Sequence, residues 1–400
     1  MRILYFHQHF STKDGATSDR SYAMARALLR RGHQVVMVCG SYRGADTGLR
    51  GPTEFGVRRG MVDGIDVVEV ALDYSNHDGF LRRSATFLRF AVRGAWIALT
   101  EPCDLIFASS TPLTAGIPGI IGKALRGRPF VFEVRDLWPE LPRAMGAIRN
   151  PAILAAMSAL EWCCYRLADR CIGLAPGIVD GIARRGVPRD RIHLVPNASD
   201  LELFGGVPAG RRSGGAACHA VFAGTHGIAN GLDSVLDAAA ELKGRGNDQV
   251  TIELVGDGKM KAQLLARANR DGLTAIRFSS PMPKPALAKK LADADVGLMI
   301  LADVPAFYNG TSPNKFFDYL ASGLPVICNY PGWVAELVSS HGCGIAVPPG
   351  NPGALADALE TMASDPERRA SMALQSKRLG ERFDRKHITT QLAEVIEATA

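Results

Sequence analysis

Short apolar runs alternate with segments of helical length along almost the whole chain. The runs are rich in β-branched and aromatic residues. Those of the first half are "RILYF" (2–6), "QVVMVCG" (34–40), "DLIFASS" (104–110), "PFVFEVRD" (129–136), "CIGLAP" (171–176) and "IHLVPN" (192–197). Those of the second half are "HAVFAG" (219–224), "TIELVG" (251–256), "AIRFSS" (275–280), "VGLMIL" (296–301), "PVICN" (325–329) and "GIAVPP" (344–349). Continuously apolar strands that alternate with helices are typical of parallel sheets covered on both faces, so the pattern predicts an α/β protein.

The predicted helices divide between two sheets. In the first half they include 19–32, 80–99 and 151–169; in the second they fall near 231–243, 259–270, 285–293, 314–322, 333–339 and 352–364. Between the halves lies the polar, turn-rich stretch 199–216. The segment 366–398 is helical and polar with one apolar stripe. We therefore predict two Rossmann-like domains.

Composition and charge indicate in which cellular compartment the protein is expected. The net charge is +6, and residues 1–200 hold 26 Lys and Arg against 19 Asp and Glu. The longest uncharged run, 105–122, is broken by Pro112 and Pro118, and the first strand is too short for a signal peptide. The eight cysteines show no metal-ligand spacing. We therefore expect a cytoplasmic protein with reduced thiols, without a transmembrane helix.

A basic amphipathic helix is predicted over 80–99. Arg82, Arg83, Arg89 and Arg93 alternate there with apolar side chains that include Trp96. Such a helix can bind the anionic inner face of the cytoplasmic membrane; the alternative is an ordinary surface helix with its arginines in water. No nucleic-acid recognition motif accompanies these arginines, so nucleic acid is not an expected partner.

Polar residues follow two strands of the first half. Open α/β sheets bind ligands at the carboxyl ends of their strands. His9 lies near the end of the first strand, and Glu133 and Asp136 end another. A carboxylate there can contact sugar hydroxyls or assist proton transfer; the alternative is an Arg135–Asp136 pair that holds the turn. His7 and His9 lack a third ligand, so no metal is expected.

Glycine-containing turns follow two strands of the second half. "VFAGTHG" (221–227) contains Gly224, Thr225 and His226, and "LVGDGKMK" (254–261) contains Gly256 and Lys259. Glycine lets a backbone approach a ligand closely, and the N–H groups of such turns can hold phosphate oxygens. For Lys259 the alternative is a solvated lysine at the start of a helix.

The stretch "GTSPNKFFDYLASGLPVI" (310–327) predicts a nucleotide site. Thr311 or Ser312 can cap a helix that has Pro313 in its first turn, and the free N–H groups of that turn attract anions. Lys315 adds a charge, and Asp318 one turn later suits ribose hydroxyls. Both are expected to face a cleft. The chain has no G-x-G-x-x-G and no P-loop motif, which argues against NAD and ATP.

These motifs resemble those of glycosyltransferase family 4. "SPNKFFDYLASGLPVI" is similar to the nucleotide-binding helix of that family, which usually has Glu in place of Asp318. "GATSDR", "VRDLWPE", "LVPNASDLELF", "VFAGTHG", "VGDG" and "DADVGLMI" follow in the family's order and spacing. The similarity is greatest to the branch that assembles bacterial polysaccharides and O-antigen repeats.

The resemblance implies a GT-B fold, in which two Rossmann-like domains with parallel sheets face each other across a cleft. Residues 1–200 would bind the acceptor, 201–377 the nucleotide sugar, and the helix at about 378–400 would pack back on the first domain. The enzyme would be retaining and metal-independent, without a cofactor. It would move a sugar, N-acetylated or not, from a UDP-sugar to a saccharide or polyprenyl-linked acceptor.

The residue patterns and the resemblance together give the candidate site residues. Asp136, Glu133, His9 and Lys315 are the catalytic candidates, and Arg82, Arg83, Arg89, Arg93 and Trp96 the membrane or acceptor candidates. The candidates for nucleotide binding are Gly15, Gly224, Thr225, His226, Gly256, Lys259, Met282, Ser312, Asn314, Lys315 and Asp318. Gly15 would contact the diphosphate from the first domain, and the turn with Met282 would contact the base.

The sequence departs from the family in two places. Gly310 stands eight residues before Asp318, where a sugar-binding Glu is common. No Arg or Lys follows "VFAG", so Lys315, Lys259 and His226, in that order, are the candidate replacements. Two other functions stay open: a UDP-sugar 2-epimerase of the same fold, and a non-catalytic protein that binds a nucleotide or a lipid carrier.

Overall fold

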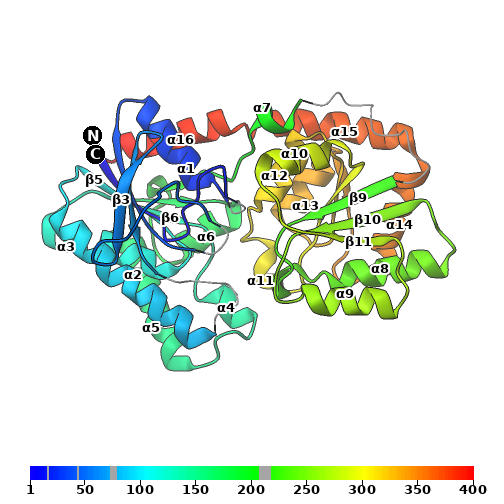
Figure 1. Ribbon diagram of the computed structural model, residues 1–400, viewed down its shortest axis with the longest axis horizontal. Helices are drawn as coiled ribbons and strands as arrows, with labels where there is room; N and C mark the ends of the chain where they lie inside the picture. Colours follow the sequence, from blue (N-terminus) through cyan, green and yellow to red (C-terminus); the bar gives the residue numbers. More distant parts are fainter. Residues whose placement is uncertain (16–17, 43–44, 73–78, 207–217) are drawn as a thin grey trace. The chain divides into compact units, whose positions relative to one another are not determined.

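The computed structural model describes residues 1–15, 18–42, 45–72, 79–206 and 218–400 and divides into two compact units (Figure 1). Unit 1 comprises Met1–Pro196 with Lys386–Ala400, and unit 2 comprises Asn197–Arg385. Residues 16–17 of the "GATSDR" motif and 207–216 of the predicted boundary lie outside the described residues. Each unit is an open sheet with helices on both faces, which confirms the predicted α/β class.

Unit 1 contains an eight-stranded sheet in the order β3-β4-β2-β1-β5-β6-β7-β8. Its strands are β1 (Arg2–Phe6), β2 (Gln34–Gly40), β3 (Val57–Val62), β4 (Ile65–Val70), β5 (Leu105–Ser109), β6 (Phe130–Val134), β7 (Arg170–Gly173) and β8 (Ile192–Leu194). All neighbours pair in parallel except β3 and β4. Every residue of β5 and β6 is buried, as expected of central strands covered on both faces.

The helices of unit 1 cover both faces of this sheet, with α1 and α16 on one side and α2 and α5 on the other (Figure 1). They are α1 (Arg20–Arg30), α2 (Phe80–Thr100), α3 (Ile117–Arg126), α4 (Glu140–Ala144), α5 (Pro151–Leu167), α6 (Pro176–Arg184) and α16 (Arg385–Glu397), with short 3₁₀ turns η1 (Leu113–Gly116) and η2 (Arg189–Arg191).

The antiparallel hairpin β3–β4 was not predicted. Its turn, Asp63–Gly64, has positive φ at both residues, which is the geometry of a two-residue hairpin turn and explains the Asp-Gly pair. No residue of β3 is fully buried, because it is the edge strand of the sheet. Its mixed polar sequence therefore lacked the continuous apolar character that identified the other strands.

Unit 2 contains a six-stranded parallel sheet in the order β11-β10-β9-β12-β13-β14. Its strands are β9 (Cys218–Ala223), β10 (Val250–Val255), β11 (Ile276–Ser279), β12 (Val296–Met299), β13 (Val326–Cys328) and β14 (Gly344–Ala346). The strand order reverses at β9, which lies between β10 and β12. Ligand sites of open α/β sheets form at such a point, at the carboxyl ends of the strands.

Helices also cover both faces of the sheet of unit 2; α8 and α9 lie on one side and α10, α12 and α15 on the other (Figure 1). They are α7 (Leu201–Phe204), α8 (Asp233–Gly244), α9 (Lys261–Arg270), α10 (Lys284–Ala292), α11 (Pro305–Tyr308), α12 (Asn314–Ala321), α13 (Trp333–Ser340), α14 (Pro352–Ser364) and α15 (Pro366–Glu381), with the 3₁₀ turn η3 (Ile228–Asn230).

The last predicted helical stretch, 366–398, is two helices. α15 ends at Glu381, Phe383 is buried in unit 2, and α16 begins at Arg385. Within unit 1, α16 is joined to the segment after α1: Glu397 accepts hydrogen bonds from Arg31 and His33, at 2.6 and 2.8 Å. The chain therefore returns to unit 1 through α16 alone.

No described helix is both long and apolar enough to span a membrane. All eight cysteines are free thiols, and seven of them are buried.

Candidate functional site

The glycine turns after β9 and β10 pack directly on each other. A Cβ atom on Gly256 would lie 1.9 Å from the carbonyl oxygen of Gly224, and one on Gly258 would lie 2.5 Å from that of His226. The amide of His226 donates to Asp257 O at 2.8 Å, and that of Met260 to His226 O at 2.9 Å. Only glycine fits these two positions, so the turns form one backbone-lined surface at the switch point of the sheet.

Lys315 reaches this surface from α12. Its Nζ lies 3.7 Å from the ring centroid of Phe222, the second-last residue of β9, and 3.1 Å from Oδ1 of Asn230. A Cβ on Gly224 would lie 2.8 Å from the same Nζ. Among the described residues, no carboxylate forms an ion pair with Lys315. Burial lowers the pKa of Lys315 to about 7, because water and a counter-charge are both scarce there.

The start of α12 differs from the sequence prediction. The helix begins at Asn314 after Pro313, and neither Thr311 nor Ser312 caps it. Ser312 instead joins the loop to the segment that opens unit 2: its Oγ accepts from the amide of Asn197 at 3.1 Å, and its carbonyl oxygen accepts from Nδ2 of Asn197. The first turn of the helix therefore has no side-chain cap, and Lys315 lies in that turn.

Asp318 is buried, where the sequence had predicted that it faces a cleft. Its carboxylate is only 3% exposed and accepts from Oγ of Ser199 at 2.9 Å and from Nζ of Lys284. The hydroxyl oxygen of Tyr319, the next residue, accepts a hydrogen bond from the amide of Ala223 at the end of β9, at 2.8 Å. Asp318 is thus a compensated charge in the wall of unit 2, and its contact with a ribose stays a prediction.

The other two predicted cations behave differently from Lys315. His226 is fully buried between Phe222 and Phe278, and burial lowers its pKa to about 4. It is therefore neutral at physiological pH, and the prediction that it supplies a charge is wrong. Lys259 is exposed on the surface.

Lys261, which the sequence did not single out, binds the backbone of the site. Its Nζ donates to the carbonyl oxygens of Gly256 at 2.7 Å and Ser279 at 3.2 Å, so it fixes the turns after β10 and β11.

Thr225 is exposed, Met282 is partly exposed, and both lie in turns that follow strands of unit 2. The structure thus gathers Gly224, Gly256 and Lys315 at one place.

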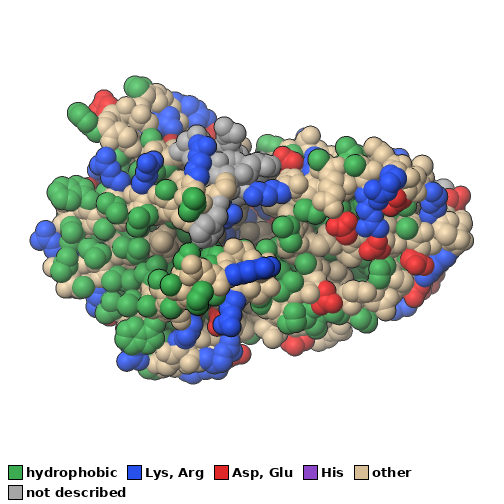
Figure 2. Space-filling view, turned by 90° about the horizontal axis from the view of Figure 1, so that it is seen from below, with side chains coloured by type: hydrophobic (Ala, Val, Ile, Leu, Met, Phe, Trp, Pro, Cys, Tyr) green, Lys and Arg blue, Asp and Glu red, His purple; other side chains and the backbone are tan. Residues whose placement is uncertain are grey.

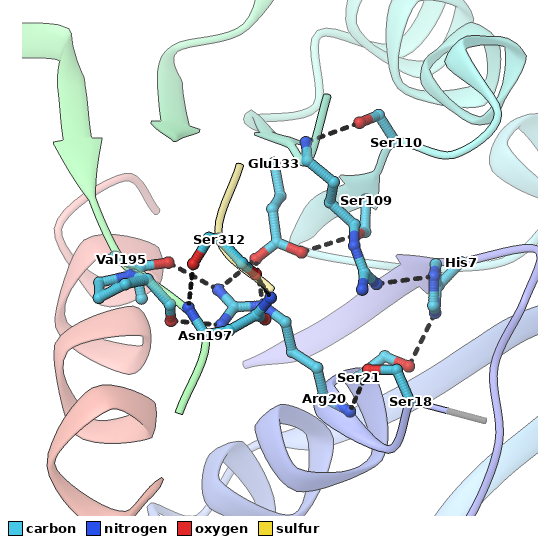
Figure 3. Close-up of polar contacts among 12 residues, drawn as sticks. His7, Ser18, Arg20, Ser21, Ser109, Ser110, Glu133, Val195, Asn197 and Ser312 are labelled. Atoms are coloured by element: carbon cyan, nitrogen blue, oxygen red, sulfur yellow. Dashed lines mark hydrogen bonds and ion pairs between the residues drawn. The ribbon is translucent and has the colours of Figure 1, made fainter. Parts of the chain in front are cut away.

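In unit 1, Glu133 and Arg20 form a buried ion pair at the end of β6 (Figure 3). Nη2 and Nε of Arg20 donate to the Glu133 carboxylate at 2.7 and 3.1 Å, and its remaining N–H groups bond to the carbonyls of Val195 and Pro196. Ser109 donates to the other carboxylate oxygen at 2.6 Å. Arg20 holds the pKa of Glu133 below its usual value despite full burial. The Glu133 carboxylate thus links β6 to α1 through Arg20 and to β5 through Ser109, which is a structural role.

Asp136 has a sparser environment. Oγ1 of Thr111 donates to its carboxylate at 3.0 Å, and burial raises its pKa. Arg135, the alternative partner, instead places Nη1 3.2 Å from Nε2 of His7. Of the two predicted carboxylates, Asp136 therefore has the less stabilised charged form, and its catalytic role stays a prediction.

His9 lies among aromatic rings. Its ring centroid is 5.1 Å from that of Tyr42 and 6.4 Å from that of Phe87, and burial lowers its pKa to about 3. His7, the less favoured of the two histidines, is buried with Nδ1 2.8 Å from Oγ of Ser21.

Among the described residues, no three His, Cys, Asp or Glu side chains are grouped to hold a metal ion. Gly15 is buried in the loop before α1, and its amide donates to Thr12 O.

The helix α2 exposes both arginines and apolar side chains. Arg82, Arg89 and Arg93 are exposed, whereas Arg83 is half-buried and lies over the ring of Phe87. The exposed apolar residues of α2 recur at helical spacing: Leu81 (82% exposed), Leu88, Val92 and Trp96 (65%). Figure 2 shows hydrophobic side chains gathered on this face of unit 1, with basic side chains around them.

Two family models together match most of the chain. Residues 15–198 match a model described as "Glycosyl transferase 4-like domain", and residues 217–365 match one described as "Glycosyl transferases group 1". The α-D-kanosaminyltransferase of Streptomyces kanamyceticus is 28% identical over 157 residues, which is 38% of this chain and 38% of that protein.

Solved structures share the fold over the whole length. A protein of Anabaena named HepE, solved in complex with UDP, has a TM-score of 0.70 at 18% identity and covers 100% of both chains. Sucrose-phosphate synthase from Thermosynechococcus elongatus has a TM-score of 0.74 at 17% identity and covers 100% of this chain and 98% of its own. A third, WaaG, is described as a glycosyltransferase involved in lipopolysaccharide biosynthesis and has a TM-score of 0.71 at 14% identity.

Proposed function

Because the chain belongs to the GT-B glycosyltransferases, we propose that it transfers a sugar from a UDP-sugar to a saccharide or lipid-linked saccharide, with retention of configuration and without a metal ion. The acceptor would be an intermediate in the assembly of a bacterial cell-surface polysaccharide. HepE, which shares the fold, was solved with UDP and with UDP-glucose, and this supports a UDP-linked donor.

The observation that carries the proposal is the environment of Lys315. Lys315 is half-buried, and a lysine in such a place without a carboxylate partner costs free energy unless an anion compensates it. Nζ of Lys315 lies next to the glycine turn after β9, and the uncapped first turn of α12 adds the positive end of the helix dipole. Together these groups can stabilise the charge of a leaving UDP, which is the task a metal ion performs in other transferases.

In unit 1 we assign Asp136 and His9 to the acceptor. A carboxyl with a raised pKa and one hydroxyl partner can exchange a proton with a sugar hydroxyl. His9 is neutral at physiological pH, so it can accept or donate one hydrogen bond. Glu133 is fully buried, and Arg20 and Ser109 already bond to its two carboxylate oxygens, so we assign it no contact with substrate.

Transfer can be tested directly with a panel of nucleotide sugars and lipid-linked saccharides. We expect UDP release that depends on an acceptor and continues in the presence of a chelator, and a product whose anomeric configuration by NMR equals that of the donor. Release without any acceptor, with a changed sugar, would favour the epimerase. UDP binding without turnover across the panel would favour a non-catalytic protein.

We further propose that α2 binds an anionic lipid surface, where a lipid-linked acceptor would be found. The helix has four arginines and no acidic residue, and its apolar side chains point outward beside them. Phe55, which is 96% exposed, extends this surface, because Nη2 of Arg93 donates to its carbonyl oxygen at 3.4 Å. Exposed apolar side chains flanked by arginines complement a membrane interface with anionic headgroups.

Replacement of Arg82, Arg89 and Arg93 by Gln should weaken binding to phosphatidylglycerol vesicles about 100-fold, at about 1 kcal/mol for each arginine. Co-sedimentation at several salt concentrations would measure it, and binding of the unchanged protein should fall as salt rises. The matched control is Lys259/Arg277/Lys289→Gln, three exposed cations of unit 2. Equal loss in both triple variants would contradict a lipid surface on α2.

A further inference from the structure

Two lysines contact or belong to α12, and they differ in whether a carboxylate compensates their charge. Lys315 contacts a ring and an amide oxygen. Lys284, the first residue of α10, instead forms an ion pair with Asp318 and lies 5.3 Å from the ring centroid of Phe204. The charge of Lys284 is therefore already compensated within unit 2, whereas that of Lys315 is not.

The pair of Lys284 and Asp318 has an accessible and an inaccessible side. The Lys284 side chain is 14% exposed and that of Asp318 is 3% exposed. Ser199, which donates to Oδ1 of Asp318, is buried. Solvent therefore reaches the pair at Lys284, and a ligand that is to contact Oδ2 of Asp318 must first move or share the ammonium group.

We infer that Lys284 competes with the nucleotide for Asp318 and thereby limits nucleotide affinity. This inference rests on the proposed function and on the prediction that the ribose hydroxyls of the nucleotide bind Asp318. In the free protein Oδ2 accepts a charge-assisted hydrogen bond from Lys284; in the complex it accepts from a neutral hydroxyl instead. Charge-assisted hydrogen bonds are about twice as strong as neutral ones, so the exchange reduces the net gain of binding.

The same exchange favours product release. Once the sugar has been transferred, the ammonium group can return to the carboxylate as the ribose leaves. A lysine beside a nucleotide site usually strengthens binding through its charge, but here the ammonium group points at a carboxylate of its own protein. Removal of the Lys284 charge should therefore strengthen UDP binding, because Oδ2 of Asp318 then has no donor in the free protein and gains one from the ribose.

The test is calorimetric titration of UDP and its 2′,3′-dideoxy analogue into the unchanged protein and Lys284→Met at pH 8. We expect Lys284→Met to bind UDP about tenfold more tightly and to release it more slowly, with little change for the dideoxy analogue. Lys289→Met, an exposed lysine on the same helix, is the matched control and should behave as the unchanged protein. Lys284→Arg, which keeps the charge, should also leave the affinity unchanged.

The outcomes separate the two proposals. If the unchanged protein binds UDP but Lys284→Met binds it equally or more weakly, competition by Lys284 is refuted and the proposed function stands. If neither binds UDP, the proposed function fails as well. Should Lys284→Met not fold, Lys284→Gln provides the second test, since a neutral donor competes less; it should tighten UDP binding several-fold, and unchanged affinity would overturn the inference.

Discussion

Replacement of Lys315 by Met is expected to weaken UDP binding about 10- to 100-fold and to reduce transfer at least as much. Hydrogen bonds to a charged group contribute about 1.5–3 kcal/mol, and Lys315 lies at the glycine turns without an ion pair to any carboxylate of the described residues. The methionine side chain keeps the contact with Phe222, so the change removes the charge with little loss of packing. Titration calorimetry with UDP would measure the effect.

The pH dependence provides an independent check on Lys315. Its pKa is lowered to about 7, and a diphosphate favours the charged form. The charged fraction of the free protein falls as the pH rises through 7, so UDP affinity should decrease between pH 6.5 and 9. Lys315→Arg stays charged and should show a flatter profile, and Lys289→Met, at an exposed lysine of α10, should match the unchanged protein. Equal affinity in Lys315→Met and the unchanged protein would contradict the site.

Replacement of Arg20 by Met is expected to destabilise unit 1 by about 3–5 kcal/mol. The change leaves the buried Glu133 carboxylate without a counter-charge, and removal of one partner of a buried ion pair costs about that much. It also leaves the carbonyl groups of Val195 and Pro196 without their donor. A lower midpoint of thermal or denaturant unfolding would report the loss.

A double variant tests the cause. Arg20→Met/Glu133→Gln no longer buries an unpaired charge, so it should recover a large part of the stability lost in Arg20→Met. Arg189→Met removes an exposed ion pair with Asp180 and serves as a control with little expected change. If Arg20→Met were as stable as Arg189→Met, Glu133 would not owe its buried state to Arg20.

Much of the fold could be predicted because its strands are continuously apolar. Strands such as β5 and β10 are buried on both faces, and burial imposes that composition. The hairpin β3–β4 was missed because an edge strand with a partly exposed surface keeps polar residues. The division between α15 and α16 was missed because the polar segment 366–398 has no proline at the break and its one glycine, Gly380, lies inside α15. The break itself contains the buried Phe383.

The candidate site was predictable only where local sequence implies chemistry. Glycines after a strand and a lysine in the first turn of a helix are local signals, and the structure brings Gly224, Gly256 and Lys315 together. Partners distant in sequence leave no such signal. Lys284 lies 34 residues before Asp318, and Arg20 lies 113 residues before Glu133, so only the folded chain shows that both carboxylates are paired. Burial likewise decided that His226 is neutral.

The most direct test of the central claim is the mass of the acceptor after incubation with a UDP-sugar. The account predicts that, for one donor and acceptor of the panel, the acceptor gains one sugar residue while UDP is released, and that Lys315→Met forms much less of this product. Tight UDP binding with no gain of acceptor mass from any UDP-sugar of the panel would contradict the assignment as a glycosyltransferase that uses UDP-sugars.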